Sequence, residues 1–310
     1  MQKNIPAILK GMVLCLGLLI LFIPPGSAAS FDEMVVFGDS LSDNGNLLFS
    51  EYQPKPDRSI YYEGRFSNGP VWVEYLVEPQ RLNTVLHDRA FGGAQSDGLV
   101  PPGLIEQVIA YIALEEFSVS ANTLFVIWIG GNDFLNGDGD SPAAVANIED
   151  AMQRLVDRGA MHLLILNLPD LGAIPDTLET PEAAEATAFT VDFNTRLANM
   201  LDTFSLDHPG VGLYTFDVAS FFVEVRNDPV QFGFVDASKP SPNFAVPDNF
   251  DGAGYVFWDE VHPTTQMHAL LADRVLTDLN RQVPNDINDS TGDDSDSTCF
   301  IGSLFMGSLP

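Results

Sequence analysis

Cysteine and basic residues are both scarce in this chain of 310 residues. It contains two cysteines, and its 14 lysines and arginines stand against 43 aspartates and glutamates, giving a formal net charge of −29. A field of that sign repels phosphate backbones and anionic lipid headgroups, so nucleic acid is not expected as a partner. The simplest interpretation of the acidic composition is solubility or an ionic habitat.

Long hydrophobic runs are also rare, and the clearest one lies in the first 29 residues. Lys3 and Lys10 form a basic start, residues 12–23 are continuously apolar, and small residues precede a predicted cleavage after Ala29. About 12 apolar residues fall short of the roughly 20 that span a bilayer. We therefore predict a cleaved signal peptide at residues 1–29, a secreted or periplasmic location, and no stable membrane span in the mature chain.

Cleavage would leave Cys299 as the single cysteine, because Cys15 lies inside the apolar run. One cysteine cannot form an internal disulfide, so stability must come from core packing. Residues 284–310 combine many aspartates with polar residues and a short apolar end, which predicts a disordered acidic tail whose role the sequence leaves open. One domain is expected between these segments, at residues 30–283.

Short apolar runs alternate with helical periodicities along this domain. The runs lie at 34–37, 84–86, 124–129, 163–166 and 211–216, and the helical patterns lie at 104–112, 145–156, 181–204 and 265–280. Such alternation predicts a three-layer α/β/α sandwich around a mainly parallel, five-stranded sheet. Residues 218–257 show no clear period and are predicted to form a long ordered insertion or a substrate-side loop.

A candidate nucleophile follows the first apolar run, in Phe37-Gly38-Asp39-Ser40. The glycine permits a tight turn, which would leave Ser40 exposed at the carboxyl edge of the sheet, where α/β folds bind ligands. A serine hydroxyl is a weak nucleophile unless a neighbouring base takes its proton. Asp and Ser are also common helix caps, so the triplet alone does not establish catalysis.

The best-placed base is His262, which follows Asp259 by three residues just ahead of the last predicted helix. That spacing lets the carboxylate reach one ring nitrogen, which leaves the other free to accept a proton. An acidic helix cap in a surface loop is the alternative. The other four histidines, which lack a comparably placed acidic partner, are His87, His162, His208 and His268.

Two glycine pairs at predicted strand ends are candidate oxyanion donors. Gly92-Gly93 follows the second run, and Gly130-Gly131 with Asn132 follows the third. Glycine exposes its backbone N–H, and Asn132 can offer its side-chain amide to a developing negative charge. Each pair taken singly is also typical of a tight turn.

The ordered set of these motifs resembles the GDSL, or SGNH, hydrolase family, in the branch of plant GDSL lipases and bacterial lecithinase/hemolysin-type enzymes. The likeness covers about residues 31–280. Its segments are 37–46, 64–72, 130–133, 167–172 and 259–262. The resemblance implies the flavodoxin-like fold of that family and a hydrolase domain at residues 30–283.

The resemblance also implies roles at single positions. Ser40 would be the nucleophile and would give its backbone N–H to the oxyanion, together with the N–H of Gly93 and the side-chain amide of Asn132. His262 would act as base and then acid, with Asp259 orienting it. The second family block here reads Asp88-Arg89-Ala90-Phe91-Gly92-Gly93, without the opening Asn and aromatic residue, so Gly92 stays an alternative to Gly93.

These features predict a secreted serine hydrolase of carboxylic esters, a lipase or esterase and possibly a phospholipase, acting on a small-molecule or lipid ester. The alternatives are a polysaccharide or short-chain acetyl esterase and, outside enzymes, an inactive SGNH-shaped surface or adhesion module. An ordinary α/β-hydrolase would need a Gly-x-Ser-x-Gly elbow, which the sequence lacks.

No cofactor or metal is expected, since no histidine pair has the spacing of metal ligands. The oligomeric state is left open. Aromatic residues in the 218–257 segment are candidates for an acyl site, with core packing as the alternative. They are Phe221, Phe222, Phe232, Phe234, Phe244, Phe250 and Phe257.

Overall fold

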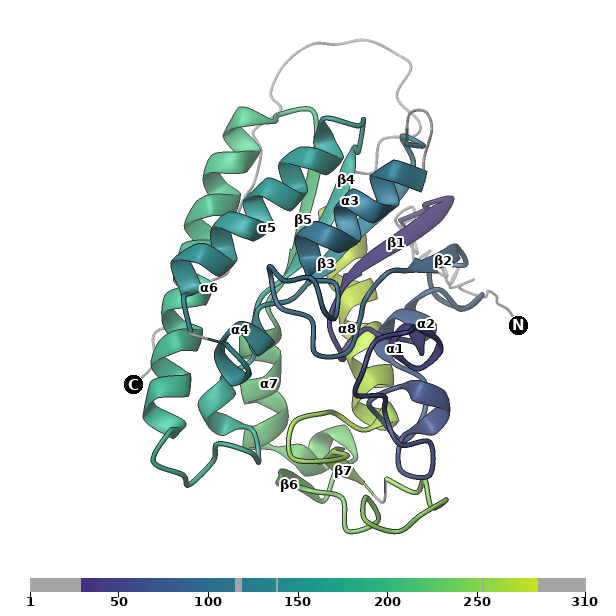
Figure 1. The fold of residues 1–310 in the computed structure, drawn as a ribbon, viewed down its shortest axis with the longest axis vertical. Coiled ribbons are helices and arrows are strands. Elements are labelled where there is room, and N and C mark those ends of the chain that lie inside the picture. The colour runs from purple at the N-terminus through teal and green to yellow at the C-terminus, as the bar shows by residue number, and fades with distance from the viewer. Residues whose placement is uncertain (1–28, 115–118, 138, 253, 284–310) are drawn as a thin grey trace, which may run out of the picture.

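A five-stranded parallel sheet forms the centre of the computed structural model, which describes residues 29–114, 119–137, 139–252 and 254–283 (Figure 1). Its strands are β1 (Glu33–Gly38), β2 (Val85–Asp88), β3 (Thr123–Trp128), β4 (His162–Leu166) and β5 (Gly212–Phe216). They pair in the order β2-β1-β3-β4-β5, the flavodoxin-like order. This confirms the predicted fold class. The predicted signal peptide, except Ala29, and the predicted tail lie outside the described residues.

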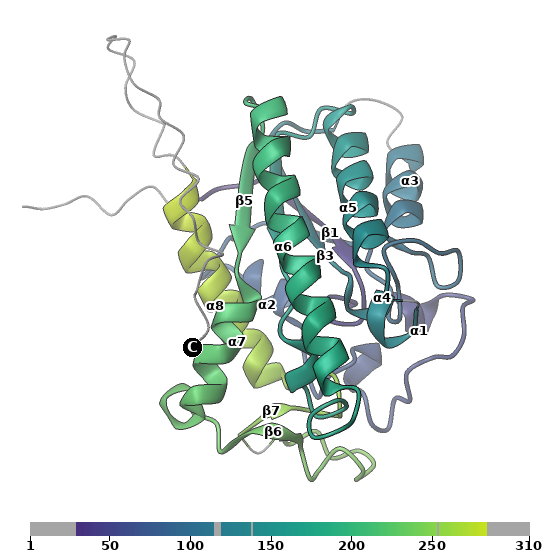
Figure 2. The same cartoon turned by 90° about the vertical axis from the view of Figure 1, so that its left-hand side faces the viewer.

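Helices cover both faces of the sheet (Figure 2). One layer contains α2 (Trp72–Leu76), α7 (Val218–Asn227) and α8 (Thr265–Gln282), and the other contains α3 (Leu104–Leu114), α5 (Ser141–Val156) and α6 (Ala183–Asp207). Smaller elements are α1 (Asn46–Phe49), α4 (Gly131–Leu135), β6 (Asp236–Pro240), β7 (Tyr255–Phe257) and 3-10 turns at Tyr62–Gly64, Leu171–Ala173 and Pro229–Phe232. The four predicted helices are confirmed, with bounds that differ from the predicted ones by two to four residues.

The strands alternate between two separate apolar cores because successive side chains point to opposite faces of a sheet. On β1, Met34 and Val36 join the core under α2, α7 and α8, whereas Val35 and Phe37 join the core under α3, α5 and α6. All four side chains are fully buried. Burial on both faces explains why these strands read as continuous apolar runs in the sequence.

The segment 218–257, predicted as a long ordered insertion or a substrate-side loop without clear period, begins with helix α7. In α7, Val218, Phe221, Phe222 and Val225 recur at helical spacing and are buried. The Asp217 side chain caps the helix by accepting the N–H of Ser220 at 3.0 Å. A helical pattern that lasts only ten residues is easily hidden inside a longer stretch without a period. The rest of the segment includes β6 and β7, which form a small parallel pair.

One close approach fixes the end of β1, where the site begins. Gly38 pairs with Trp128 on the neighbouring strand β3. A Cβ atom on Gly38 would lie 2.6 Å from the carbonyl oxygen of Trp128, which leaves no room for a side chain. Glycine is therefore required for the two strands to end side by side, two residues before Ser40.

Among the described residues, no helix is both long and apolar enough to cross a membrane.

Candidate active site

The structure brings Ser40, His262 and Asp259 into one hydrogen-bonded chain. Ser40 lies two residues after β1, and His262 lies three residues before α8. The Nε2 atom of His262 is 2.8 Å from Ser40 Oγ, and its Nδ1 atom is 2.7 Å from Asp259 Oδ2. In this geometry the carboxylate holds the Nδ1 proton, so Nε2 is free to accept the proton of the serine hydroxyl.

Both oxygens of the buried Asp259 carboxylate have partners. Oδ1 accepts the backbone N–H groups of Val261 and His262 at 2.7 and 2.6 Å. Oδ2 accepts the hydroxyl of Tyr61 at 2.7 Å in addition to His262. Burial favours the neutral form, but the charge of His262 and these hydrogen bonds hold the pKa of Asp259 below its usual value.

Tyr61 was missed by sequence reasoning. It lies 198 residues before Asp259 in the chain, in a loop without strand or helix periodicity. No local spacing connects the two residues, so only the fold reveals the contact.

A second carboxyl group, Asp39, acts on His262. It is buried next to Ser40, and it accepts the N–H of Leu41 at 3.0 Å. Burial raises the pKa of Asp39 to about 7, although the nearby His262 opposes the shift. Burial alone would lower the pKa of His262, but the charge and hydrogen bond of Asp259, with a smaller contribution from Asp39, raise it above the usual value. The imidazole is therefore a stronger base than one in water.

The glycine pair after β2 is held by Asp43, a fully buried carboxylate. Its Oδ2 accepts the N–H of Gly92 at 2.8 Å and that of Leu47 at 3.2 Å. Its Oδ1 accepts the N–H groups of Gly45 and Asn46 at 2.8 and 2.5 Å. The N–H of Gly92 therefore already has an acceptor. Sequence reasoning included Asp43 in the first motif but gave it no role.

Asn132 connects the third motif to the second. Its Nδ2 donates to the carbonyl oxygen of Ala94, next to Gly93, at 3.0 Å. Its Oδ1 accepts the side-chain amide of Asn136 at 2.7 Å, which fixes the orientation of the amide group. The amide has a second N–H, and Asn132 lines the same pocket as Ser40. Gly93 is not among the residues that line this pocket.

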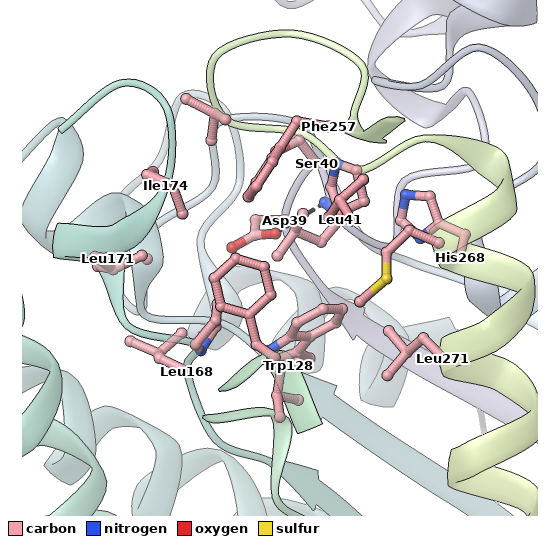
Figure 3. A pocket seen from close by; sticks show the side chains of 18 of the residues that line it. Asp39, Ser40, Leu41, Trp128, Leu168, Leu171, Ile174, Phe257, His268 and Leu271 are labelled. Atoms are coloured by element: carbon pink, nitrogen blue, oxygen red, sulfur yellow. Dashed lines mark hydrogen bonds between the residues drawn. The ribbon is translucent and has the colours of Figure 1, made fainter. Parts of the chain in front are cut away.

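An apolar pocket opens beside Ser40. Figure 3 shows Leu168, Leu171, Ile174 and Phe257 around this space. Apolar residues from α7 and α8 complete the wall: Val218, Phe221, Phe222, Met267 and Leu271.

Three of the seven predicted aromatic residues, Phe221, Phe222 and Phe257, line the pocket, and the other four do not. Ser40 was expected to be exposed, but only 7% of its surface is accessible. The expectation was wrong because the pocket wall and the adjacent His262 enclose the turn after β1.

Within the described ranges, no cluster of three or more His, Cys, Asp or Glu side chains is arranged to hold a metal ion.

The chain is similar to known proteins along most of its length. A protein-family model described as GDSL-like lipase/acylhydrolase matches residues 34–275. The thermolabile hemolysin of Vibrio parahaemolyticus is 30% identical over 80% of this chain and 64% of the hemolysin, so the chain spans less than two thirds of that relative. The phosphatidylcholine-sterol acyltransferase of Aeromonas hydrophila is 29% identical over 88% of this chain and 98% of that protein.

Similarity at low identity also extends to a solved structure. A member of the lipolytic protein G-D-S-L family from Veillonella parvula matches with a TM-score of 0.48 and 18% identity, over 79% of this chain and 96% of that chain.

Proposed function

Since the chain belongs to the GDSL-like lipase/acylhydrolase family, a family of hydrolases acting on ester bonds, we propose that it is a secreted serine hydrolase of lipid-like carboxylic esters. The observation that carries the proposal is the 2.8 Å contact between Ser40 Oγ and His262 Nε2 at the wall of an apolar pocket. The Ser40 hydroxyl is both within hydrogen-bonding reach of the base and part of the wall of a pocket that suits an apolar acyl group.

In the first half-reaction, Ser40 Oγ attacks the ester carbonyl carbon while its proton passes to His262 Nε2. The carbonyl π electrons move to the oxygen, which becomes an oxyanion. We assign its stabilisation to the backbone N–H groups of Ser40 and Gly93 and to the side-chain amide of Asn132. Gly93 is preferred over Gly92, because the N–H of Gly92 is donated to Asp43.

When the tetrahedral intermediate collapses, the bond to the leaving alcohol breaks and His262 returns its proton to the alcohol oxygen. The acyl group remains on Ser40. In the second half-reaction His262 removes a proton from water, the water oxygen attacks the acyl carbon, and Ser40 leaves with the proton. Asp259 holds the imidazole in one tautomer and stabilises its positive charge throughout.

The pocket favours an acyl group that is itself apolar. Its wall is built from aliphatic and aromatic side chains, so binding there removes hydrocarbon surface from water. The name of the Aeromonas hydrophila relative makes phosphatidylcholine a natural substrate to test. The signal-peptide pattern in residues 1–29 supports export.

The test is a comparison of kcat/KM for p-nitrophenyl acetate, a long-chain p-nitrophenyl ester and phosphatidylcholine vesicles. We expect turnover of all three, with the long-chain ester preferred over the acetate. Turnover of the acetate alone would overturn the lipid assignment. Ser40→Ala is the matched control, and hydrolysis by that variant would overturn the assignment of the nucleophile.

A further inference from the structure

We propose that the segment 60–69, which the mechanism above does not use, clamps the Asp259–His262 pair in its reactive geometry, with Tyr61 as the main positioning residue. The inference rests on the proposed function. The segment contains Gly64-Arg65-Phe66-Ser67-Asn68-Gly69, the larger part of the 64–72 sequence motif, to which no role has been given above. It approaches His262 from a different part of the chain than α8 does.

Tyr61 is the contact that acts on the chemistry most directly. Its hydroxyl donates to Asp259 Oδ2 at 2.7 Å, and the same oxygen accepts from His262 Nδ1 at 2.7 Å. Its ring packs edge-on to the imidazole, with centroids 6.3 Å apart. One carboxylate oxygen is therefore shared between the base and a donor from the segment 60–69.

Phe66 supports the imidazole on another side. Its ring lies 5.1 Å from the His262 ring, centroid to centroid, and 5.3 Å from the ring of Tyr61. It also fills the space at Gly92, where a Cβ atom would lie 2.2 Å from the Phe66 ring. Phe66 thus packs between the base and the glycine pair after β2, and sets their separation.

Hydrogen bonds hold the backbone on both sides of His262. Before it, the Trp258 indole donates to the carbonyl oxygen of Ile60 at 3.1 Å. After it, Ser67 Oγ donates to the carbonyl oxygen of Pro263 at 2.9 Å, and Asn68 Oδ1 accepts the N–H of Thr265 at 2.8 Å. Residues 258–265 are therefore held against the segment 60–69 by contacts before His262, at the Asp259–His262 pair and after His262.

The shared oxygen makes a specific prediction about charge. The Tyr61 hydroxyl stabilises the carboxylate of Asp259, and hydrogen bonds to charged groups are stronger than neutral ones. Burial, and then the charge of Asp259, raise the pKa of Tyr61, so the phenol stays a donor throughout the working range. Without this donor, Asp259 attracts the proton of His262 more strongly, and the pKa of His262 rises further.

The test is Tyr61→Phe in the full chain, with kcat, KM and the pH profile of kcat/KM measured on one p-nitrophenyl ester. We expect kcat to fall about tenfold or more, in line with the loss of a hydrogen bond to a charged group. KM should change less than kcat, and the acid limb should move to higher pH. Asp39 and Glu260 also act on the pKa of His262, and His268 is a neighbouring imidazole whose pKa His262 lowers; none of these groups is altered.

Tyr214→Phe is the matched control. It removes the hydroxyl of a buried tyrosine on β5, which lies 3.1 Å from His162 Nδ1 and away from Ser40. Its kcat and acid limb should match those of the unmodified protein. An unchanged kcat and an unmoved acid limb in Tyr61→Phe would overturn the role of Tyr61 and leave the proposed function intact. The proposed function itself would be overturned by ester hydrolysis in Ser40→Ala.

If Tyr61→Phe does not fold, as judged by its thermal transition, Phe66→Leu decides the question. That variant keeps the hydrogen bond to Asp259 but loses the ring contact with His262. We expect a lower kcat with an unmoved acid limb. A kcat within twofold of the unmodified protein would contradict the clamp.

Discussion

The two oxygens of the Asp259 carboxylate have different roles: one binds backbone N–H groups, and the other binds the imidazole. Oδ1 binds the backbone of its own turn, which fixes the carboxylate, and Oδ2 faces Nδ1 of His262. This division sets the imidazole tautomer, because Nδ1 must donate and Nε2 must then accept. Ser40 lies at the accepting nitrogen, so the direction of proton transfer follows from how one carboxylate is held.

The first prediction at the residue scale concerns pH. The base must be neutral to accept a proton, so activity is present above the pKa of His262 and is lost as the pH falls through it. Asp259 raises that pKa above its ordinary value of 6.5 despite burial. The acid limb of kcat/KM should therefore lie above pH 6.5.

Asp259→Asn should move this limb to lower pH and reduce kcat by about 10⁴, because the charge and the correct tautomer are both lost. The measurement is a pH–rate profile of both proteins on a soluble p-nitrophenyl ester. An identical limb in the two proteins would show that Asp259 does not act on the base.

The second prediction concerns Asn132. Its replacement by alanine should lower kcat by about 10²–10³, with KM changed far less, as expected for one oxyanion donor. Asn280→Ala, at the far end of α8 and outside the pocket, serves as the control. Equal kcat values in Asn132→Ala and the control would remove Asn132 from the oxyanion site.

Local spacing determined which residues could be predicted. Asp259 and His262 are three positions apart, and Ser40 directly follows a buried strand, so sequence pattern alone selected them. Tyr61 touches Asp259 across 198 positions, and the Asp43–Gly92 contact spans 49. Nothing in the local sequence of either residue specifies such a contact, because it depends on how separate loops pack at the edge of the sheet.

At the scale of elements, the site depends on strands that end at one edge. The five strands were predictable because burial on both faces makes each a short apolar run. Helix α7 was not, because its ten residues lie between Asp- and Pro-rich turns that hide the period. The helix nevertheless supplies Phe221 and Phe222 to the pocket wall. The missed element therefore contributes part of the wall of the pocket beside Ser40.

The prediction at this scale is made for Gly38. Alanine there would clash with a backbone oxygen of β3, which cannot rotate away, so β1 and β3 must separate. Overpacking of this kind costs about 1–3 kcal/mol of unfolding free energy. We also expect a lower kcat, because Ser40 follows two residues later.

Gly210→Ala is the control for this change, since a Cβ atom at Gly210 meets no other atom within 4 Å. Urea unfolding of both variants provides the measurement. If Gly38→Ala were as stable as Gly210→Ala, the close approach of the two strands would not be required.

At the scale of the whole molecule, two features stand out: a double core and a strongly acidic composition. The sheet separates two apolar clusters, which fits a chain whose predicted mature form has a single cysteine and no internal disulfide. The net charge of −29 acts over longer distances. It should oppose approach to any surface of the same sign.

The charge makes a prediction about salt. Hydrolysis of vesicles that contain anionic lipid should speed up several-fold as ionic strength rises from about 0.01 to 0.15 M, because the screening length falls from about 30 to 8 Å. Hydrolysis of purely zwitterionic vesicles should change little over the same range. Faster hydrolysis of anionic vesicles at low salt would contradict a repulsive field.

The central claim is that Ser40 is a nucleophile activated by His262, and covalent labelling tests it most directly. A fluorophosphonate reacts with an activated serine hydroxyl, and peptide mass spectrometry locates the added mass. We predict one label per chain, on Ser40, with loss of ester hydrolysis in proportion to labelling and with no label in Ser40→Ala or His262→Ala. Stoichiometric labelling of a different residue, or full hydrolytic activity after complete labelling of Ser40, would contradict the account.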